Sequence, residues 1–252
     1  MNPAASSATS KNPVALISTS NKTGIIELAR TLVEKYQFTL ISSGGTAAAL
    51  KQANIPVTKV SDYTGAPEIL GGRVKTLHPK VHGGILARLE VTEDLEDLER
   101  QQIQAIALVV VNLYPFAETI AKSGVTLDEA IEQIDIGGPT LIRAAAKNHK
   151  YVTILSDPSQ YSSYLEEMES HSGKTSLEFR RSLALAAFQH TQSYDYAISQ
   201  YLIQDLAQES QEPAESFVLI GQKPQTLRYG ENPHQNAIWY QLEGSTRGWS
   251  NA

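Results

Sequence analysis

The sequence contains no cysteine, and this absence excludes several kinds of chemistry. Without thiols the chain forms no disulfide, offers no thiolate nucleophile and holds no cysteine-ligated zinc or iron–sulfur site. Long hydrophobic runs are also missing, since the apolar stretch 106–111 is far shorter than the ~20 residues that span a membrane. The N-terminal segment is rich in alanine and serine and has no apolar centre, unlike a signal peptide. We therefore expect a cytoplasmic protein that does not bind membranes.

Positive charge is scarce as well. The 21 lysine and arginine residues are outnumbered by 27 aspartate and glutamate residues, which gives a formal net charge of −6. This balance argues against polyanion binding as the main activity, so nucleic acid is not an expected partner. Hydrophobic residues make up 41% of the chain, which is enough to close a core, so we expect a globular protein.

Short apolar segments alternate with helical patterns, and this alternation predicts an α/β fold. The run 105–111 is apolar without polar alternation, as in a central parallel strand that is covered on both faces. We predict a three-layer sandwich with a mainly parallel central sheet. The expected strands are 14–18, 38–41, 57–60, 105–111 and 151–155. The expected helices include 25–36, 46–53, 94–102, 127–134, 140–147, 158–168 and a long one over about 176–206.

Changes in composition divide the chain into four expected segments. Residues 1–12 have nothing to bury and should form a disordered tail, and residues 13–206 should form the α/β domain. Residues 207–226 mix acidic and polar side chains with two prolines, as linkers do. Residues 227–252 contain turn signals and an aromatic, strand-like pair, and we expect them to be the truncated start of a second domain.

The loops that follow the first two predicted strands are suited to an anion. Ligands bind beyond the carboxyl ends of parallel strands, and helix N-termini there carry free N–H groups and about half a positive charge. The first loop, STSNKTG, contains Ser20 and Lys22, and the second, SSGGTAA, contains residues 43–46. Neither has the glycine spacing of a dinucleotide or nucleoside triphosphate site, so a bound monophosphate is predicted. The alternative is two ordinary helix caps beside a solvated lysine.

A third segment, GGRVKTLHPKVHGGILAR, concentrates positive charge. Arg73 and Lys75 belong to a stretch without acidic residues, which predicts a local basic surface or a solvated basic loop. Glycine pairs at both ends and Pro79 in the middle argue against a helix. His78 and His82 are then not expected to share a helical face, and we predict no metal site.

A fourth segment, IDIGGPTLIRAAAKNHK, predicts a buried helix with one cationic stripe. Thr140, Arg143 and Lys147 recur on one face, while the other faces are apolar, and Asp135 precedes the glycine pair. Such a stripe must face either solvent or an anionic ligand. Tyr114 follows the central strand in VNLYPF, where its hydroxyl could transfer a proton or its ring could fill a turn.

The chain resembles one known family through six motifs that occur in order between about Pro13 and Tyr201: SxSxKTG, SSGGTA, GGRVKTLHPxVHGGILAR, NLYPF, IDIGGPTLIRAAAKN and AFxHTxxYDxAI. The family is the multifunctional purine-biosynthesis enzyme that joins phosphoribosylaminoimidazolecarboxamide (AICAR) formyltransferase, also called AICAR transformylase, to IMP cyclohydrolase. The segment LRYGENPHQ resembles the start of the formyltransferase domain. The resemblance implies a methylglyoxal-synthase-like sandwich for residues 13–206, which agrees with the predicted α/β fold.

The same resemblance implies roles for individual residues. Lys147 matches the family's proton donor/acceptor, and Lys75, Tyr114 and Asp135 match the catalytic residues around it. The positions that match nucleotide-binding segments are Ser20, Asn21, Lys22, Ser43, Gly44, Gly45, Thr46, Arg73, Val74, Thr76, Val111, Asn112 and Ile136. A remnant of the second site is expected at Arg228 and Tyr229.

The implied activity is that of IMP cyclohydrolase, a hydrolase that closes 5-formamidoimidazole-4-carboxamide ribotide to IMP with loss of water in the last step of de novo purine biosynthesis. The implied ligand is a small purine nucleotide, and a homodimer is an oligomeric state that the resemblance allows. No cofactor is expected for this reaction. The cofactor 10-formyltetrahydrofolate serves only formyl transfer, an activity that we do not expect from this chain.

Three alternatives stay open at this point. The chain could be a regulatory module of the same fold that binds a nucleotide without turnover, although the presence of Lys75 and Lys147 speaks against it. A triose-phosphate lyase of the methylglyoxal synthase kind would share the phosphate loops but would give no role to RVKTLHP or IDIGGPTLIRAAAKN. The third alternative is a folded but inactive fragment.

Overall fold

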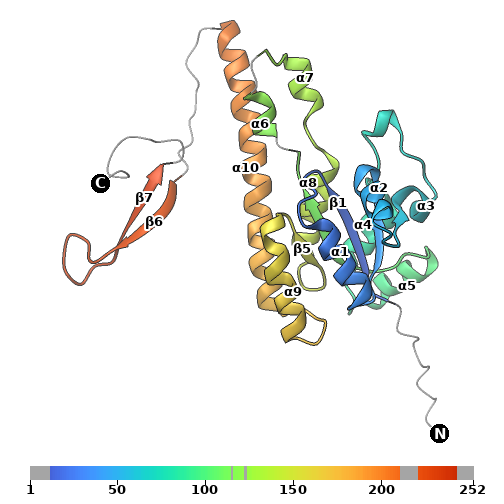
Figure 1. The fold of residues 1–252 in the computed structure, drawn as a ribbon. Coiled ribbons are helices and arrows are strands. Elements are labelled where there is room, and N and C mark those ends of the chain that lie inside the picture. The colour runs from blue at the N-terminus through green and yellow to red at the C-terminus, as the bar shows by residue number, and fades with distance from the viewer. Residues whose placement is uncertain (1–11, 115, 122–123, 211–220, 243–252) are drawn as a thin grey trace. The chain divides into compact units, whose positions relative to one another are not determined.

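The computed structural model describes residues 12–114, 116–121, 124–210 and 221–242 (Figure 1). The chain divides into two compact units, Met1–Tyr201 and Leu202–Ala252. The predicted tail, apart from Asn12, lies outside the described residues.

A five-stranded, all-parallel sheet forms the centre of the first unit, in the order β3-β2-β1-β4-β5. Leu16 in the middle of β1 pairs with Ile41 on one side and with Val109 on the other, and all three residues are buried. The predicted parallel sheet is therefore confirmed. Its strands are β1 (Val14–Thr19), β2 (Thr39–Ser42), β3 (Thr58–Lys59), β4 (Ile106–Asn112) and β5 (Thr153–Leu155).

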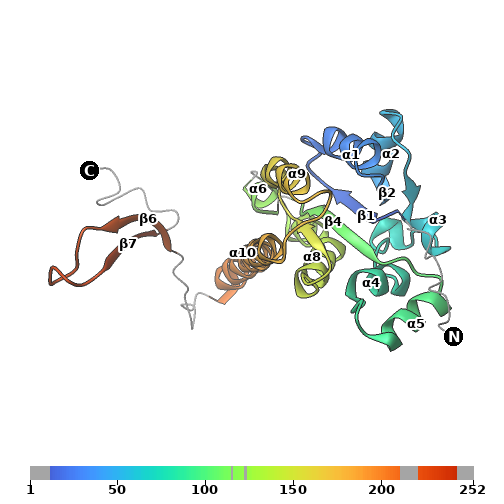
Figure 2. The same ribbon diagram turned by 90° about the horizontal axis from the view of Figure 1, so that it is seen from below.

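Helices cover both faces of this sheet, which confirms the predicted three-layer α/β sandwich. On one face α1 (Ile25–Glu34) packs on β2, and α2 (Gly44–Gln52) packs on β1 and β2; on the other face α4 (Pro79–Leu86) and α8 (Gly137–Lys147) pack on β4 (Figure 2). The remaining helices are α3 (Val60–Thr64), α5 (Thr92–Arg100), α6 (Phe116–Ile120), α7 (Leu127–Glu132), α9 (Tyr161–Ser170) and α10 (Leu177–Ser210), with 3₁₀ turns at Leu70–Gly72 and Pro158–Gln160.

Helix α4 contradicts the prediction that its segment is not helical. Pro79 is tolerated because it lies in the first turn, where its missing N–H has no partner to lose. His78 caps the helix, since its Nδ1 accepts the N–H of Lys80 at 3.1 Å. Gly84 allows close packing before β4, because a Cβ atom there would lie only 2.6 Å from the carbonyl oxygen of Gln104. Gly84, one of the glycines that argued against a helix, is therefore a packing requirement of that helix.

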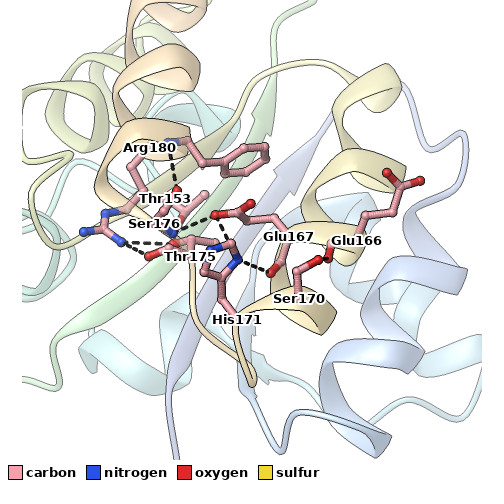
Figure 3. A network of polar contacts seen from close by, with 9 residues as sticks. Thr153, Glu166, Glu167, Ser170, His171, Thr175, Ser176 and Arg180 are labelled. Atoms are coloured by element: carbon pink, nitrogen blue, oxygen red, sulfur yellow. Dashed lines mark hydrogen bonds and ion pairs between the residues drawn. The ribbon is translucent and has the colours of Figure 1, made fainter.

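A polar network fixes the first turns of α10 to the sheet unit (Figure 3). The guanidinium group of Arg180 donates to the carbonyl oxygens of His149 and Lys150, both at 2.8 Å, in the turn between α8 and β5. Glu167 of α9 accepts the N–H of Ser176, just before α10, at 2.8 Å. These contacts hold the start of the long helix at a defined position.

The second unit contains an antiparallel pair of strands, β6 (Gly221–Leu227) and β7 (Ala237–Leu242). Because α10 reaches Ser210 and β6 begins at Gly221, regular structure occupies both ends of the expected linker 207–226. Arg228 and Tyr229, which the resemblance assigns to a second site, directly follow β6 and are exposed. Among the described residues, none of the helices combines the length and apolar character needed to cross a membrane.

We expect Gly84→Ala to destabilise the protein by about 1–3 kcal/mol, because the added methyl group would collide with the backbone of Gln104. The matched control is Gly83→Ala, whose Cβ atom would meet only the flexible end of Ile103 at 3.2 Å. Alanine stabilises a helix by ~1 kcal/mol relative to glycine, which should offset this close contact. The free energy of unfolding of Gly83→Ala should therefore be close to that of the parent. Urea unfolding measures both, and equal stabilities of the two variants would contradict the packing of α4.

Candidate functional site

A cavity of about 160 Å³ opens beyond the carboxyl ends of β1, β2 and β4. The segment before α4 and the start of α8 complete its walls, so five separate stretches of chain meet there. Most of the lining residues are predicted site residues. The lining residues are Ser18, Ser43, Gly44, Gly45, Gly72, Arg73, Lys75, Thr76, Leu77, Val111, Asn112, Tyr114, Asp135, Gly137 and Gly138.

One wall of this cavity is the N-terminus of α2, as the SSGGTAA loop predicts. Ser43 is the N-cap residue, and its side chain makes no capping hydrogen bond. A Cβ atom at Gly44 would lie 3.5 Å from Nζ of Lys75, and one at Gly45 would lie 3.7 Å from Nζ of Lys22. Two ammonium groups thus converge on a helix N-terminus, which is a favourable arrangement for a phosphate group.

The cations of the RVK segment are only weakly paired. Nζ of Lys75 lies 3.6 Å from a carboxylate oxygen of Glu68, and Nε of Arg73 lies 3.6 Å from one of Glu132. All four side chains are partly exposed, and ion pairs of this kind contribute ~0–1 kcal/mol. Gly72 has φ +91° and a Cβ there would lie 2.7 Å from Cε of Lys75, so glycine is required beside this lysine. A phosphate could therefore replace either carboxylate at small cost.

The opposite wall carries the half-buried carboxylate of Asp135, directly before α8. Its Oδ1 accepts the N–H of Gly138 at 2.9 Å, and its backbone N–H donates to the hydroxyl oxygen of Tyr194 at 2.8 Å. Burial raises the pKa of Asp135, while hydrogen bonds from the N–H groups of Gly138 and Gly137 act in the opposite direction. A carboxyl group with a raised pKa at the wall of a cavity is typical of a general acid or base.

Asn112 at the end of β4 organises the neighbouring loop. Its Oδ1 accepts the N–H groups of Ser20 and Asn21 at 2.7 and 2.9 Å, and its Nδ2 donates to the carbonyl oxygen of Asn21 at 2.8 Å. The side-chain amide is therefore committed to fixing the loop after β1. Tyr114, two residues further on, is 54% exposed and lines the cavity.

Thr46 is buried within the first unit and does not line the cavity. Its hydroxyl accepts the N–H of Thr19 at 3.1 Å and donates to the carbonyl oxygen of the same residue at 2.9 Å. The hydroxyl therefore joins α2 to the end of β1. The resemblance placed Thr46 among the nucleotide-binding positions, whereas its side chain has a structural role.

Only one of the two predicted helix N-termini lines this cavity. Helix α1 begins at Ile25, after Gly24 in a left-handed conformation, and a Cβ atom at Gly24 would lie 3.4 Å from the ring of Tyr161. The start of α1 thus packs against another part of the fold. From this loop Lys22 extends toward α2, and Ser20 and Asn21 line a neighbouring cavity.

The polar stripe of α8 does not line the cavity either. Thr140 donates to the carbonyl oxygen of Ile136 at 2.7 Å, and the guanidinium carbon of Arg143 lies 5.6 Å from the ring centre of Phe188 on α10. Lys147 is the last residue of α8 and is exposed. About 15 Å of helix separates it from Gly137, the first residue of α8, which lines the cavity. The cavity therefore gathers Lys75, Tyr114 and Asp135 but not Lys147, whose role stays a prediction from the resemblance.

Two further predicted binding residues, Val74 and Ile136, lie in loops and do not line the cavity. Val74 forms an isolated bridge with Ile69, and Ile136 is the 60% exposed N-cap residue of α8.

The histidines of the α4 segment do not form part of a metal cluster. His78 uses Nδ1 to cap α4, and burial lowers the pKa of His82. Over the described parts of the chain, no group of three or more histidine, aspartate or glutamate side chains could hold a metal ion.

The sequence interpretation missed Tyr194 as part of the site. Tyr194 lies on α10, about sixty residues after Asp135 in the sequence, and contacts that residue through its hydroxyl group. The motif AFxHTxxYDxAI contains this tyrosine, but its spacing alone does not show which loop the ring reaches.

The fold and the cavity define the chain as an α/β protein with a methylglyoxal-synthase (MGS)-like domain, and the family model of that domain matches residues 24–140. A second family model, that of the AICARFT/IMPCHase bienzyme, matches residues 145–252. A crystal structure of ForH is 35% identical and superimposes with a TM-score of 0.66, covering 75% of this chain and 98% of that chain.

Two cyanobacterial relatives extend the comparison. The bifunctional purine biosynthesis protein PurH of Nostoc punctiforme is 61% identical over 239 residues, and that of Thermosynechococcus vestitus is 61% identical over 242 residues. Each alignment covers 95% of this chain and 46% of the relative. The chain belongs to the AICARFT/IMPCHase bienzyme family. It spans about half the length of the curated relatives that it matches.

We expect Thr46→Val to lower the free energy of unfolding by about 1–3 kcal/mol, because it leaves the buried N–H of Thr19 without its acceptor. Thr31→Val is the matched control, since the hydroxyl of Thr31 donates to Glu27 within an outer helix and leaves no buried group behind. Urea unfolding measures both variants. Unchanged stability of Thr46→Val together with weakened phosphate binding would instead assign the hydroxyl to the ligand.

Proposed function

We propose that this chain is an IMP cyclohydrolase, which converts 5-formamidoimidazole-4-carboxamide ribotide to IMP and water. The observation that carries the proposal is one cavity lined by an electropositive helix N-terminus, Lys75 and the half-buried carboxylate of Asp135, with Lys22 beside the same helix N-terminus. A nucleoside monophosphate has the matching groups, with a phosphate at one end and proton-exchanging nitrogens at the other. The family relationship to bifunctional purine biosynthesis proteins supports the same reaction.

For this reaction the protein has to position the substrate and transfer protons. The carboxamide nitrogen attacks the neighbouring formyl carbon, a C–N bond forms, and the formyl oxygen leaves as water. The two protons of that water are balanced by one proton lost from the carboxamide nitrogen and one lost from the formamide nitrogen. Both reacting groups are attached to the same ring, so binding the correct rotamer contributes much of the acceleration. No cofactor is needed to balance these atoms.

The phosphate is assigned to the start of α2. The N–H groups of Gly44 and Gly45 would bind its oxygens, and Lys22 and Lys75 would neutralise its charge. Lys75 matches a catalytic position of the family, yet its ammonium group lies at this end of the cavity, so we assign it first to binding. Arg73 lies beside it on the same loop and would reinforce the positive potential.

The reacting ring is assigned to the opposite wall. Asp135 would accept a proton from the carboxamide nitrogen, a poor nucleophile that needs a base. Tyr114, which lines the same cavity, would donate to the developing negative charge on the formyl oxygen. For Lys147 the proton donor/acceptor role is proposed from the resemblance alone.

The decisive test is to add the formamido ribotide to the purified chain and to follow IMP formation. We expect turnover by the parent, and for Asp135→Asn a kcat about 10²–10⁴-fold lower with the nucleotide dissociation constant little changed. Asp128→Asn is the matched control, since Asp128 is exposed on α7 and should not affect kcat. A parent chain that binds the ribotide without forming IMP would contradict the proposal and favour the regulatory module.

The pH dependence provides a second test. Burial raises the pKa of Asp135, and this carboxyl group must be ionised to act as a base, so the rate should fall as the pH drops through that pKa. We therefore expect the acidic limb of kcat/KM to lie above the ordinary aspartate pKa of about 3.9. The measurement is a pH–rate profile, with protein unfolding monitored at each pH. A profile that stays flat down to pH ~4 would contradict the assignment of the base.

A further inference from the structure

The hydroxyl group of Tyr194 lies where it can set the position of the Asp135 loop. Its oxygen accepts the backbone N–H of Asp135 at 2.8 Å, and its hydrogen is directed to the carbonyl oxygen of Gln133 at 3.5 Å. Tyr194 is only 8% exposed, so most of its ring is enclosed by protein atoms. The same loop is held from the other side by the bond between the N–H of Gly138 and the Asp135 carboxylate. Asp135 is therefore held at two points, its backbone by Tyr194 and its carboxylate by Gly138.

The ring of Tyr194 is held in turn by the surrounding fold. It packs edge-on against Phe116, with ring centres 6.2 Å apart. Arg180 anchors the first turns of α10 to the carbonyl oxygens of His149 and Lys150, about 21 Å of helix before Tyr194. A rigid helix that is anchored at Arg180 delivers the hydroxyl to the loop at a defined point. This contact gives a role to the AFxHTxxYDxAI motif, which the proposed chemistry does not use.

Tyr194 also lines a second cavity, of about 580 Å³, which adjoins the candidate site. The two cavities share Asn112 and Tyr114 as lining residues. A small aromatic molecule could therefore reach the position of the Tyr194 ring from this cavity. In a variant that lacks the ring, added phenol could supply the missing hydroxyl group.

We propose that Tyr194 is a positioning residue for the cyclisation: its hydroxyl holds the backbone of Asp135 so that the carboxylate faces the carboxamide nitrogen. The inference rests on the proposed role of Asp135 as the base. Tyr194 itself touches neither the substrate nor the reacting atoms. Its removal should therefore slow the chemical step and leave ground-state binding of the nucleotide, at the start of α2, nearly unchanged.

The first test compares two Tyr→Phe variants in the full chain. Tyr194→Phe keeps the ring but deletes the hydroxyl, and since small misplacements of reacting groups are costly we expect kcat to fall about 10- to 100-fold with KM within about threefold of the parent. Tyr164→Phe is the matched control, because Tyr164 is a buried tyrosine of α9 outside both cavities, and its kcat should match the parent. Equal kcat values for Tyr194→Phe and the parent would overturn the proposal.

The second test separates hydrogen bonding from packing. Tyr194→Ala removes the whole ring, and we expect added phenol to raise its kcat several-fold because phenol restores both the ring and the acceptor oxygen. Benzene fills the same space without the oxygen and should stabilise the variant, measured as a higher melting temperature, without raising kcat. Equal rescue of kcat by benzene and phenol would show that Tyr194 serves only packing and would overturn the proposal.

Asp135→Asn, measured in the same series, distinguishes failure of the positioning role of Tyr194 from failure of the base role of Asp135. If Asp135→Asn is inactive and Tyr194→Phe is fully active, the positioning role fails while the proposed function stands. If Asp135→Asn turns over like the parent, the base assignment fails, and the positioning role fails with it.

Discussion

The parallel pairing of β1 with β2 on one side and β4 on the other is the constraint on which the candidate site depends. Because these three strands run in the same direction and in register, their carboxyl ends meet at one edge of the sheet. The strand order changes direction between β1 and β4, and open α/β sheets bind ligands at such a point. The start of α2, the end of β4 and the Asp135 loop face one cavity because buried strand residues fix this alignment.

Several polar residues near this edge hold the loops in place and leave ligand binding to others. Thr46 joins α2 to β1, Asn112 fixes the loop after β1, and Tyr194 holds the Asp135 loop. Each uses its side chain on backbone groups that would otherwise be unpaired, which is costly when they are buried. The groups that remain for the proposed ligand include the N–H groups at the start of α2, the cations beside them, the Tyr114 hydroxyl and the Asp135 carboxylate.

The sequence predicted the parallel sheet and a helix after the glycine turn that follows the second strand, because these depend on local hydrophobic patterns and turn residues. The grouping of Lys75, Tyr114 and Asp135 was implied by the family resemblance. The sequence prediction was wrong for α4, because Gly84 is required there by close contact with the backbone of Gln104, twenty residues away in the sequence. The resemblance grouped Lys147 with the catalytic residues; this lysine lies at the opposite end of α8 from the residues that line the cavity, and its role stays a prediction. Which polar atom meets which partner depends on tertiary contacts that no local pattern contains, as Thr46 and Tyr194 show.

The most direct test of the central claim is a structure of the chain with IMP bound. We expect the phosphate oxygens within about 3 Å of the N–H groups of Gly44 and Gly45, with the purine ring between Tyr114 and Asp135. Such a complex would place both ends of the nucleotide in the cavity at the edge of the sheet. A phosphate bound elsewhere, or a ring turned away from Asp135, would contradict the account.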